Sequence, residues 1–290
     1  MSTTSTTAAP STSTTTHIKG ASALDFPALS SATEAARLRA QHALVTAAVG
    51  GLAPPTATSC TNCARSRRTQ RRHLATPRRR PTCTSRHDIL TPFPAAWRNS
   101  FDLIQLRTVL SNLARRAQAV ATLANVLPLL KPGTGHVQLV DGTQMTGTIR
   151  ADDRASVKVL RALANGAESV GRDLGVGREL VGLLRDACTS SSNNSKEDEN
   201  IAIDITDARE VHSIFGHGAG SAELEELGVS EMRSLYRVVR MGMQQMGSGV
   251  WEAAGIPRGE FEGLEEALVR ETRECGVPWT WYVADARRVR

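Results

Sequence analysis

The stretch FDLIQLRTVLSNLARRAQAVATLANVLPLLKPGTGHVQLVD, residues 101–141, decides the fold of this 290-residue chain. It begins with a short apolar segment (101–107), continues with apolar residues at helical spacing (111–130) and ends in a second apolar segment (136–141). A Lys-Pro-Gly turn stops the helix, because proline and glycine interrupt helical patterns. Strand, helix and strand in this order predict a βαβ unit with parallel strands and a right-handed crossover.

Further helices and strands are predicted on both sides of this unit. Upstream, apolar residues at helical spacing over 32–49 predict a helix that Gly50 and Gly51 end. The downstream elements that we expect are helices at 153–187 (in two pieces broken near Gly171 to Gly177), 221–246 and 260–274, and strands at 201–205 and 280–286. Alternating strands and helices predict an α/β fold, with a parallel sheet and flanking helices.

The positive charge of the chain is concentrated in one acid-free segment, residues 65–86. Removing its nine arginines from the net charge of +6 leaves −3 for all other residues. A function that depends on a basic surface would therefore have to reside in this segment. The nine are Arg65, Arg67, Arg68, Arg71, Arg72, Arg78, Arg79, Arg80 and Arg86.

The sequence shows no signal for export or membrane insertion. The Ser/Thr-rich start has no apolar core of a secretory signal, and no apolar run reaches membrane-spanning length. The five cysteines are an odd number, and without export free thiols are the default. We expect a cytoplasmic protein with no membrane partner, with the nucleus as the alternative compartment.

The segment 87–141 carries a family resemblance. An Asp before a Pro-Phe-Pro turn (HDILTPFP), a strand of the type FDLIQLR and a turn LLKPGTG into HVQLVD resemble class I S-adenosylmethionine-dependent methyltransferases, in particular the fungal group associated with secondary metabolism. Weaker similarity extends over residues 30–55 and 141–290. The resemblance implies a Rossmann-like fold that transfers a methyl group from S-adenosylmethionine to a small-molecule acceptor.

The chain departs from this family in the segment before Asp88. There the family places its first strands and a glycine-rich turn, whose backbone N–H groups approach the cofactor, and an acid that binds the ribose. Residues 56–87 contain no glycine and no acid, and their composition predicts no strand. We therefore expect an incomplete fold that lacks its first strands, with the cofactor-binding motif missing or replaced.

Four regions follow from these patterns. Residues 1–30 are expected to be a disordered Ser/Thr-rich tail, because they cannot bury a core. The other three are a leading helix (31–53), a basic linker rich in Arg, Pro and Cys (54–87) and a partial methyltransferase-like domain (88–290). Loss of the first strands exposes edges of the sheet, so we expect poor solubility or a partner protein that covers them.

Four residues are the candidates for cofactor contact. Asp88, with its neighbour Ile89, matches the acid on the adenine side of the cofactor; the alternative is an Asp that begins a turn. Gln105 and Arg107 end the first predicted strand, at the edge where α/β sheets bind ligands; the alternative is an ordinary polar pair at a strand end.

A catalytic residue cannot be assigned from the sequence. Asp141 ends the second predicted strand at the same edge as Arg107. Methyl transfer depends mainly on alignment of the reacting atoms, and a base is needed only where the acceptor must lose a proton.

Two alternatives to a methyltransferase stay open. The first is a non-catalytic pseudoenzyme or interaction module. The second is zinc or nucleic-acid binding through residues 60–87, where Cys60 and Cys63 have zinc-like spacing. The segment has three cysteines and no aromatic residue among its arginines, so we expect neither a metal site nor a nucleic-acid partner.

Overall fold

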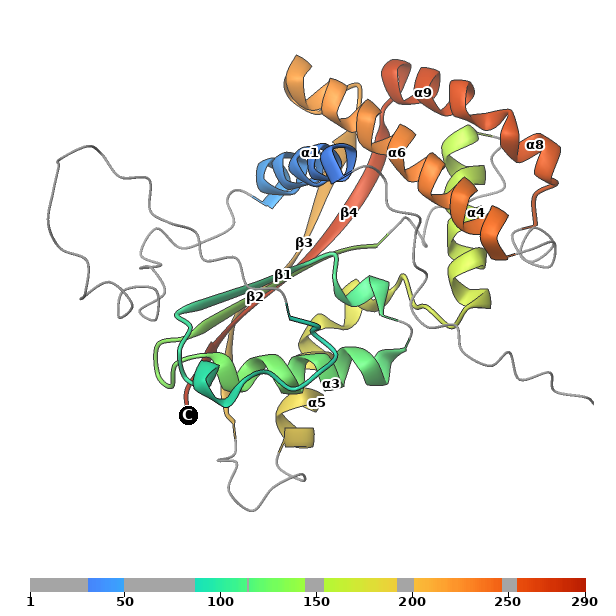
Figure 1. The fold of residues 1–290 in the computed structure, drawn as a ribbon. Coiled ribbons are helices and arrows are strands. Elements are labelled where there is room, and N and C mark those ends of the chain that lie inside the picture. Colours follow the sequence, from blue (N-terminus) through green and yellow to red (C-terminus); the bar gives the residue numbers. More distant parts are fainter. Residues whose placement is uncertain (1–30, 50–86, 114, 144–153, 192–200, 247–254) are drawn as a thin grey trace, which may run out of the picture.

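The fold is a four-stranded sheet with helices on both faces (Figure 1), seen in a computed structural model that describes residues 31–49, 87–113, 115–143, 154–191, 201–246 and 255–290. The predicted α/β class with flanking helices is confirmed. The strands are β1 (Leu103–Arg107), β2 (His136–Thr143), β3 (Ile203–Phe215) and β4 (Val277–Arg288). The helices are α1 (Ser31–Val49), α3 (Arg116–Val126), α4 (Ala155–Ser169), α5 (Leu180–Ser191), α6 (Ala222–Met246), α8 (Arg258–Glu262) and α9 (Leu264–Glu274), with short 3-10 turns η1 (Ala95–Trp97), η2 (Leu110–Asn112), η3 (Leu127–Leu129) and η4 (Val176–Glu179).

The strand order is β1-β2-β4-β3, so the last strand of the chain lies inside the sheet. Strands β1 and β2 are parallel, as the βαβ unit predicts, with Leu103 opposite His136 and Arg107 opposite Val140. Strand β4 is antiparallel to both of its neighbours, β2 and β3. The sheet is therefore mixed rather than purely parallel, because the final strand enters from the opposite direction.

One face of the sheet packs on α3 and α5. Helix α3 buries Leu123, and α5 buries Leu183 and Leu184, against Leu139 and other residues of the strands. In Figure 1 these two helices lie together below the sheet. We call this the α3/α5 face.

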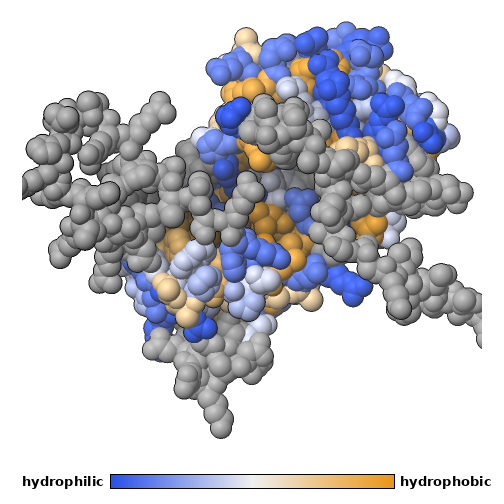
Figure 2. Space-filling view, viewed as in Figure 1, coloured by the Kyte–Doolittle hydropathy of each residue, from blue (hydrophilic) through white to orange (hydrophobic). Residues whose placement is uncertain are grey.

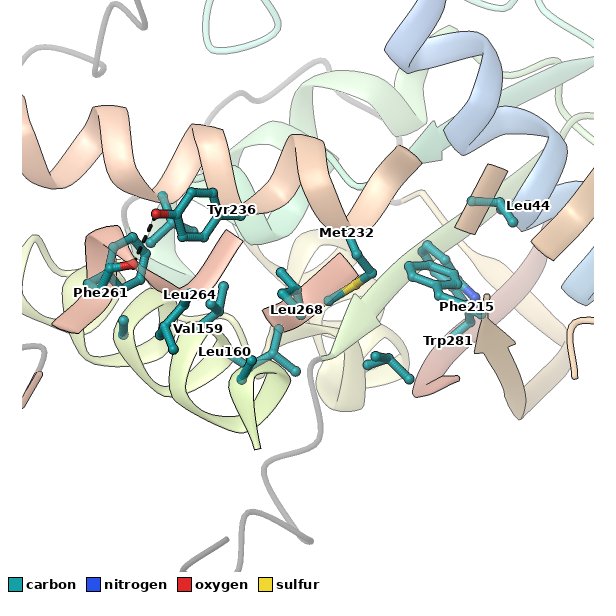
Figure 3. Close-up of a cluster of buried hydrophobic side chains, with 14 of the residues drawn as sticks. Leu44, Val159, Leu160, Phe215, Met232, Tyr236, Phe261, Leu264, Leu268 and Trp281 are labelled. Atoms are coloured by element: carbon teal, nitrogen blue, oxygen red, sulfur yellow. Dashed lines mark hydrogen bonds between the residues drawn. The ribbon is translucent and has the colours of Figure 1, made fainter. Parts of the chain in front are cut away.

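The opposite face packs on α1 and α6, and we call it the α1/α6 face. Trp281 of β4 is buried there with Phe215 of β3 and Met232 of α6 (Figure 3). The same cluster continues into α4, α8 and α9, where the Tyr236 ring stacks on Phe261 with 5.0 Å between the ring centroids. The Tyr236 hydroxyl donates to the Phe261 carbonyl at 2.9 Å, which joins α6 to α8.

The turn from α3 into β2 is fixed by two glycines and by the end of the chain. Gly133 has a φ of +77°, a backbone conformation that strains other residues, and a Cβ on Gly135 would lie 2.6 Å from the Lys131 nitrogen, where no side chain fits. Arg288 is buried and donates to the carbonyls of Pro128 and Leu130. The KPGTG sequence is thus held by β4 as well as by its own backbone.

Some predicted elements differ from the structure, and others lie outside the described residues. Strand β3 extends to Phe215, ten residues beyond the predicted 201–205. The predicted tail (1–30) and nearly all of the basic linker (54–87) fall outside the described residues, so the zinc and nucleic-acid alternatives, which involve residues 60–87, stay predictions. Within the described part of the chain, no helix combines the length and hydropathy of a membrane span.

Candidate functional site

The candidate site lies at the carboxyl end of β1, beside the last residues of β2. Arg107 and Val140 are register partners, and the Thr108 nitrogen donates to the Val140 carbonyl at 2.8 Å. Thr108 has a φ of +48°, so the chain turns sharply away from the sheet directly after β1. Open α/β sheets bind ligands at this edge, beyond the carboxyl ends of their strands.

Asp141 is the most deeply buried charged side chain of this edge, with an exposed fraction of 1%. It lies on the α3/α5 face, because side chains alternate along β2 and Leu139 is on that face. Its Oδ2 atom accepts hydrogen bonds from the backbone N–H groups of Leu110 and Ser111, both at 3.1 Å. The carboxylate therefore ties the turn after β1 to the end of β2.

Within the described residues, the two oxygens of the Asp141 carboxylate differ in their hydrogen bonds. Its Oδ1 atom is buried and has no hydrogen-bond partner in the described part of the chain. Burial raises the pKa of Asp141 to about 6, against the lowering effect of its bonds to Ser111 and Leu110. A carboxyl group that titrates near neutrality at a sheet edge has the chemistry of a proton acceptor or donor.

Gln105 and Arg107 lie on the opposite face of β1 from Leu106, which packs on the α3/α5 face. The Gln105 amide donates to Gln138 of β2 at 2.9 Å. The Arg107 guanidinium is hydrogen-bonded to the His42 ring of α1, and burial lowers the pKa of Arg107. Both candidates thus face the α1/α6 side of the sheet, and each already has a side-chain partner.

Asp88 and Ile89 have local roles in the structure. The Asp88 carboxylate accepts the Leu90 N–H at 3.0 Å, and its carbonyl accepts the Thr91 N–H at 3.0 Å. This is the turn-forming use of Asp that the sequence left open. Ile89 packs against the α3/α5 face. No hydrogen bond within the described residues joins Asp88 or Ile89 to Gln105 or Arg107.

The structure adds His42 and Ser111 to this edge, which the sequence did not assign to it. His42 lies 65 residues before Arg107, so no local spacing could pair them. Ser111 was expected to begin a helix, whereas its N–H bonds to Asp141 within the 3-10 turn η2. Sequence patterns indicate which residues share an element, but these contacts depend on how α1 and η2 pack on the sheet.

Gly142 follows Asp141 in β2 and lies on the α1/α6 face, beside Trp279 and Trp281. A Cβ there would lie 2.6 Å from the Trp279 indole nitrogen and 2.9 Å from the Trp281 ring. The Trp279 ring stacks on Phe215, with 5.0 Å between the centroids. Its buried indole N–H has no partner within the described residues. Gly142 is required by the close approach of the tryptophans, not by its backbone conformation.

Three of the four candidate residues for cofactor contact are engaged in hydrogen bonds within the protein. No described strand lies beside β1 on the side away from β2, and the described residues offer no glycine-rich turn at its carboxyl end. Asp88 is held in its own turn, and Gln105 and Arg107 are bonded to Gln138 and His42. Asp141 Oδ1 is the one polar atom of the candidate residues that is buried without a partner in the described residues.

The comparisons with known proteins give one curated relative of moderate similarity. No protein-family model matches the chain. Over 204 residues it is 27% identical to "N-methyltransferase tcpN" of Claviceps purpurea (strain 20.1), a match that covers 70% of this chain. The chain spans 65% of the length of that relative.

Among the solved structures that the chain matches are two with low sequence identity and a low TM-score. The chain matches the [4+2]-cyclase SpnF with a TM-score of 0.31 and 14% identity, over 70% of this chain and 55% of that one. It matches phospholethanolamine N-methyltransferase 2 of Haemonchus contortus, in complex with phosphomonomethylethanolamine and S-adenosylhomocysteine, with a TM-score of 0.31 and 12% identity, over 68% and 35% of the two chains.

Proposed function

We propose that this chain is a methyltransferase-like protein whose site for S-adenosylmethionine is incomplete, so that methyl transfer to a small-molecule acceptor is impaired or absent. The observation that carries the proposal is the position of β1. It forms an edge of the sheet within the described residues, although the family that the sequence resembles places its cofactor-binding strands at this side.

The class is supported by sequence similarity and by the βαβ unit. The relative named N-methyltransferase aligns with 70% of this chain, and β1, α3 and β2 follow the order that the resemblance implies. The acceptor, the pathway and the activity are not given by this similarity, because the match covers 65% of the relative.

The impairment is supported by the sequence before Asp88 and by the engaged candidates. Residues 56–87 contain neither the glycine that lets a backbone approach a cofactor nor the acid that binds a ribose. Gln105 and Arg107 would have to exchange their bonds to Gln138 and His42 for bonds to a ligand. Each exchange reduces the net gain from binding.

Isothermal titration of the full-length protein with S-adenosylmethionine tests the proposal. We expect no heat of binding up to millimolar ligand from a protein shown to be folded by circular dichroism. A matched chimera, in which the corresponding segment of the N-methyltransferase relative replaces residues 56–86, should gain binding in the micromolar range. Micromolar binding by the unaltered chain would show that the proposal is wrong.

A non-catalytic interaction module is the second candidate, and the open edge of β1 favours it. An edge strand presents backbone N–H and C=O groups that can pair with another chain. Failure of the chimera to bind S-adenosylmethionine, although folded, would favour this second function over a repairable enzyme.

A further inference from the structure

The two edges of the sheet differ in how they are protected against pairing. Natural proteins protect an exposed edge with charged side chains, bulges or proline, because a bare edge can recruit another strand. The edge strand β3 has such protection: its register with β4 is shifted between Ile205 and Asp207. It also carries five charged or titratable side chains, namely Asp204, Asp207, Arg209, Glu210 and His212.

The edge strand β1 has neither a bulge nor a proline, and Arg107 is its one charged residue. Its sequence is LIQLR, its register with β2 runs without a shift from Leu103 to Arg107, and it contains no proline. No strand in the described part of the chain pairs with its outer side. Figure 2 shows a patch of hydrophobic surface in the middle of the view, whereas the exposed residue of β1 itself is Gln105.

The charge pattern of β1 suits a second copy of itself. In an antiparallel pair with a twofold axis through Gln105, Gln105 lies opposite its own copy and Ile104 lies opposite Leu106. Arg107, the one charged residue of β1, then lies opposite Leu103, so no like charges meet. Pairing with β3 of another copy would be an open-ended contact, and it would meet the bulge and charges of that strand.

We propose that β1 pairs with β1 of a second copy of this chain. The two four-stranded sheets of the dimer then form one continuous sheet of eight strands. The contact uses the backbone groups of five residues and the side chains of both faces. A contact of this size is weak, and we expect a dissociation constant on the order of 0.1 mM. The proposal shares one observation with the proposed function, the edge position of β1, but it concerns assembly and not cofactor binding.

Sedimentation velocity of the full-length protein over a range from about 10 to 500 µM tests the proposal at the affinity expected for a small interface. We expect a monomer at low concentration and a dimer at high concentration. Gln105→Lys places two lysines opposite each other in the twofold register, so dimerisation should weaken at least tenfold. Ala208→Lys adds the same charge to exposed β3 and should leave the dimer unchanged.

A second variant guards against misfolding of Gln105→Lys. Gln105→Glu should dimerise poorly at pH 7, where two carboxylates face each other, and recover in part at pH 4, where most of them are protonated. A wild-type protein that stays monomeric at 500 µM would overturn the proposal. So would dimers that both Gln105 variants retain, or wild-type assemblies larger than a dimer.

Discussion

The two ends of β2 are built in opposite ways. At the amino end, Arg288 donates from its guanidinium to Asn99, to two backbone carbonyls and to the carbonyl of Arg290, and Lys131 bonds Asp102 at 2.7 Å. At the carboxyl end, two buried polar groups have no hydrogen-bond partner within the described residues: one oxygen of the Asp141 carboxylate and the indole N–H of Trp279.

The two ends therefore contribute differently to stability. The polar groups at the amino end stabilise the fold, whereas the unpaired polar groups at the carboxyl end reduce its stability. Buried polar groups are normally satisfied, and those that are not cost stability. The amino end follows the rule, which is expected where a turn must be fixed. The carboxyl end violates it at the edge where α/β sheets bind ligands, and such violations concentrate at functional sites.

The largest effect is expected from Arg288→Met, at the amino end. The variant removes the donor of the buried Leu130 carbonyl and one of the two donors of the Pro128 carbonyl, which keeps the Asn99 N–H, so the free energy of unfolding should fall by about 3 kcal/mol. Urea unfolding followed by circular dichroism measures the change. Arg287→Met is the control, because Arg287 is exposed and its ion pair with Asp204 spans 3.7 Å. Equal losses in both variants would contradict the comparison.

The next effect concerns Asp141→Asn, at the carboxyl end. The folded pKa of about 6 lies above the reference of 3.8, so the folded state binds the proton more tightly than the unfolded state. The protonated Asp141 carboxyl group therefore stabilises the folded state below pH 4. This contribution to the free energy of unfolding, about 2–3 kcal/mol, is lost as the pH rises to about 6. Relative to wild type, Asp141→Asn should gain about this amount between pH 4 and pH 7.

Urea unfolding at both pH values measures this gain, because the titration of all other groups cancels in the difference between the two proteins. Asp204→Asn is the control for the same substitution at an exposed position of the sheet. A difference between wild type and Asp141→Asn that stays constant from pH 4 to pH 7 would show that Asp141 has an ordinary pKa.

A smaller effect is expected from Lys131→Met, again at the amino end. The pair of Lys131 and Asp102 is about a quarter exposed on each side, so its loss should cost about 1 kcal/mol at low salt and less at high salt. Urea unfolding at two salt concentrations measures both values. Lys131→Arg keeps the charge and should lose less than half as much. A loss that salt does not change would argue against an electrostatic role.

The smallest effect is expected from His42→Ala, at the carboxyl end. The bond between His42 and Arg107 lies near the surface, so its removal should change the free energy of unfolding by less than about 0.5 kcal/mol. Thermal unfolding of both proteins is sufficient to test this. A loss as large as that of Arg288→Met would mean that the carboxyl end stabilises the fold as much as the amino end does.

The elements with strong local patterns could be predicted from the sequence. The βαβ unit is found where the apolar segments predicted it, and the pattern over 153–187 divides into α4 and α5 as expected. Strand β3 was recognised only in its first residues. Its remainder, TDAREVHSIF, mixes charged and apolar residues as exposed edge strands do, and this pattern gives a weak strand signal.

The position of the candidate site could be predicted from the sequence, but the contacts of its residues could not. The carboxyl edge followed from the βαβ unit, but the burial of Asp141 depends on η2, and the contact of Arg107 depends on α1. The mixed direction of the sheet was also beyond local patterns, because nothing within 280–286 determines which strands lie beside it. These features arise from long-range packing.

The central position of β4 has a consequence for how the protein folds during synthesis. Strands β2 and β3 both pair with β4 and not with each other, so neither can complete its hydrogen bonds until translation has passed Arg288. Their contacts with β4 span long stretches of sequence, which slows folding. A nascent chain therefore exposes two incomplete strands from the synthesis of Phe215 until that of Arg288, a state in which aggregation and chaperone binding compete with folding.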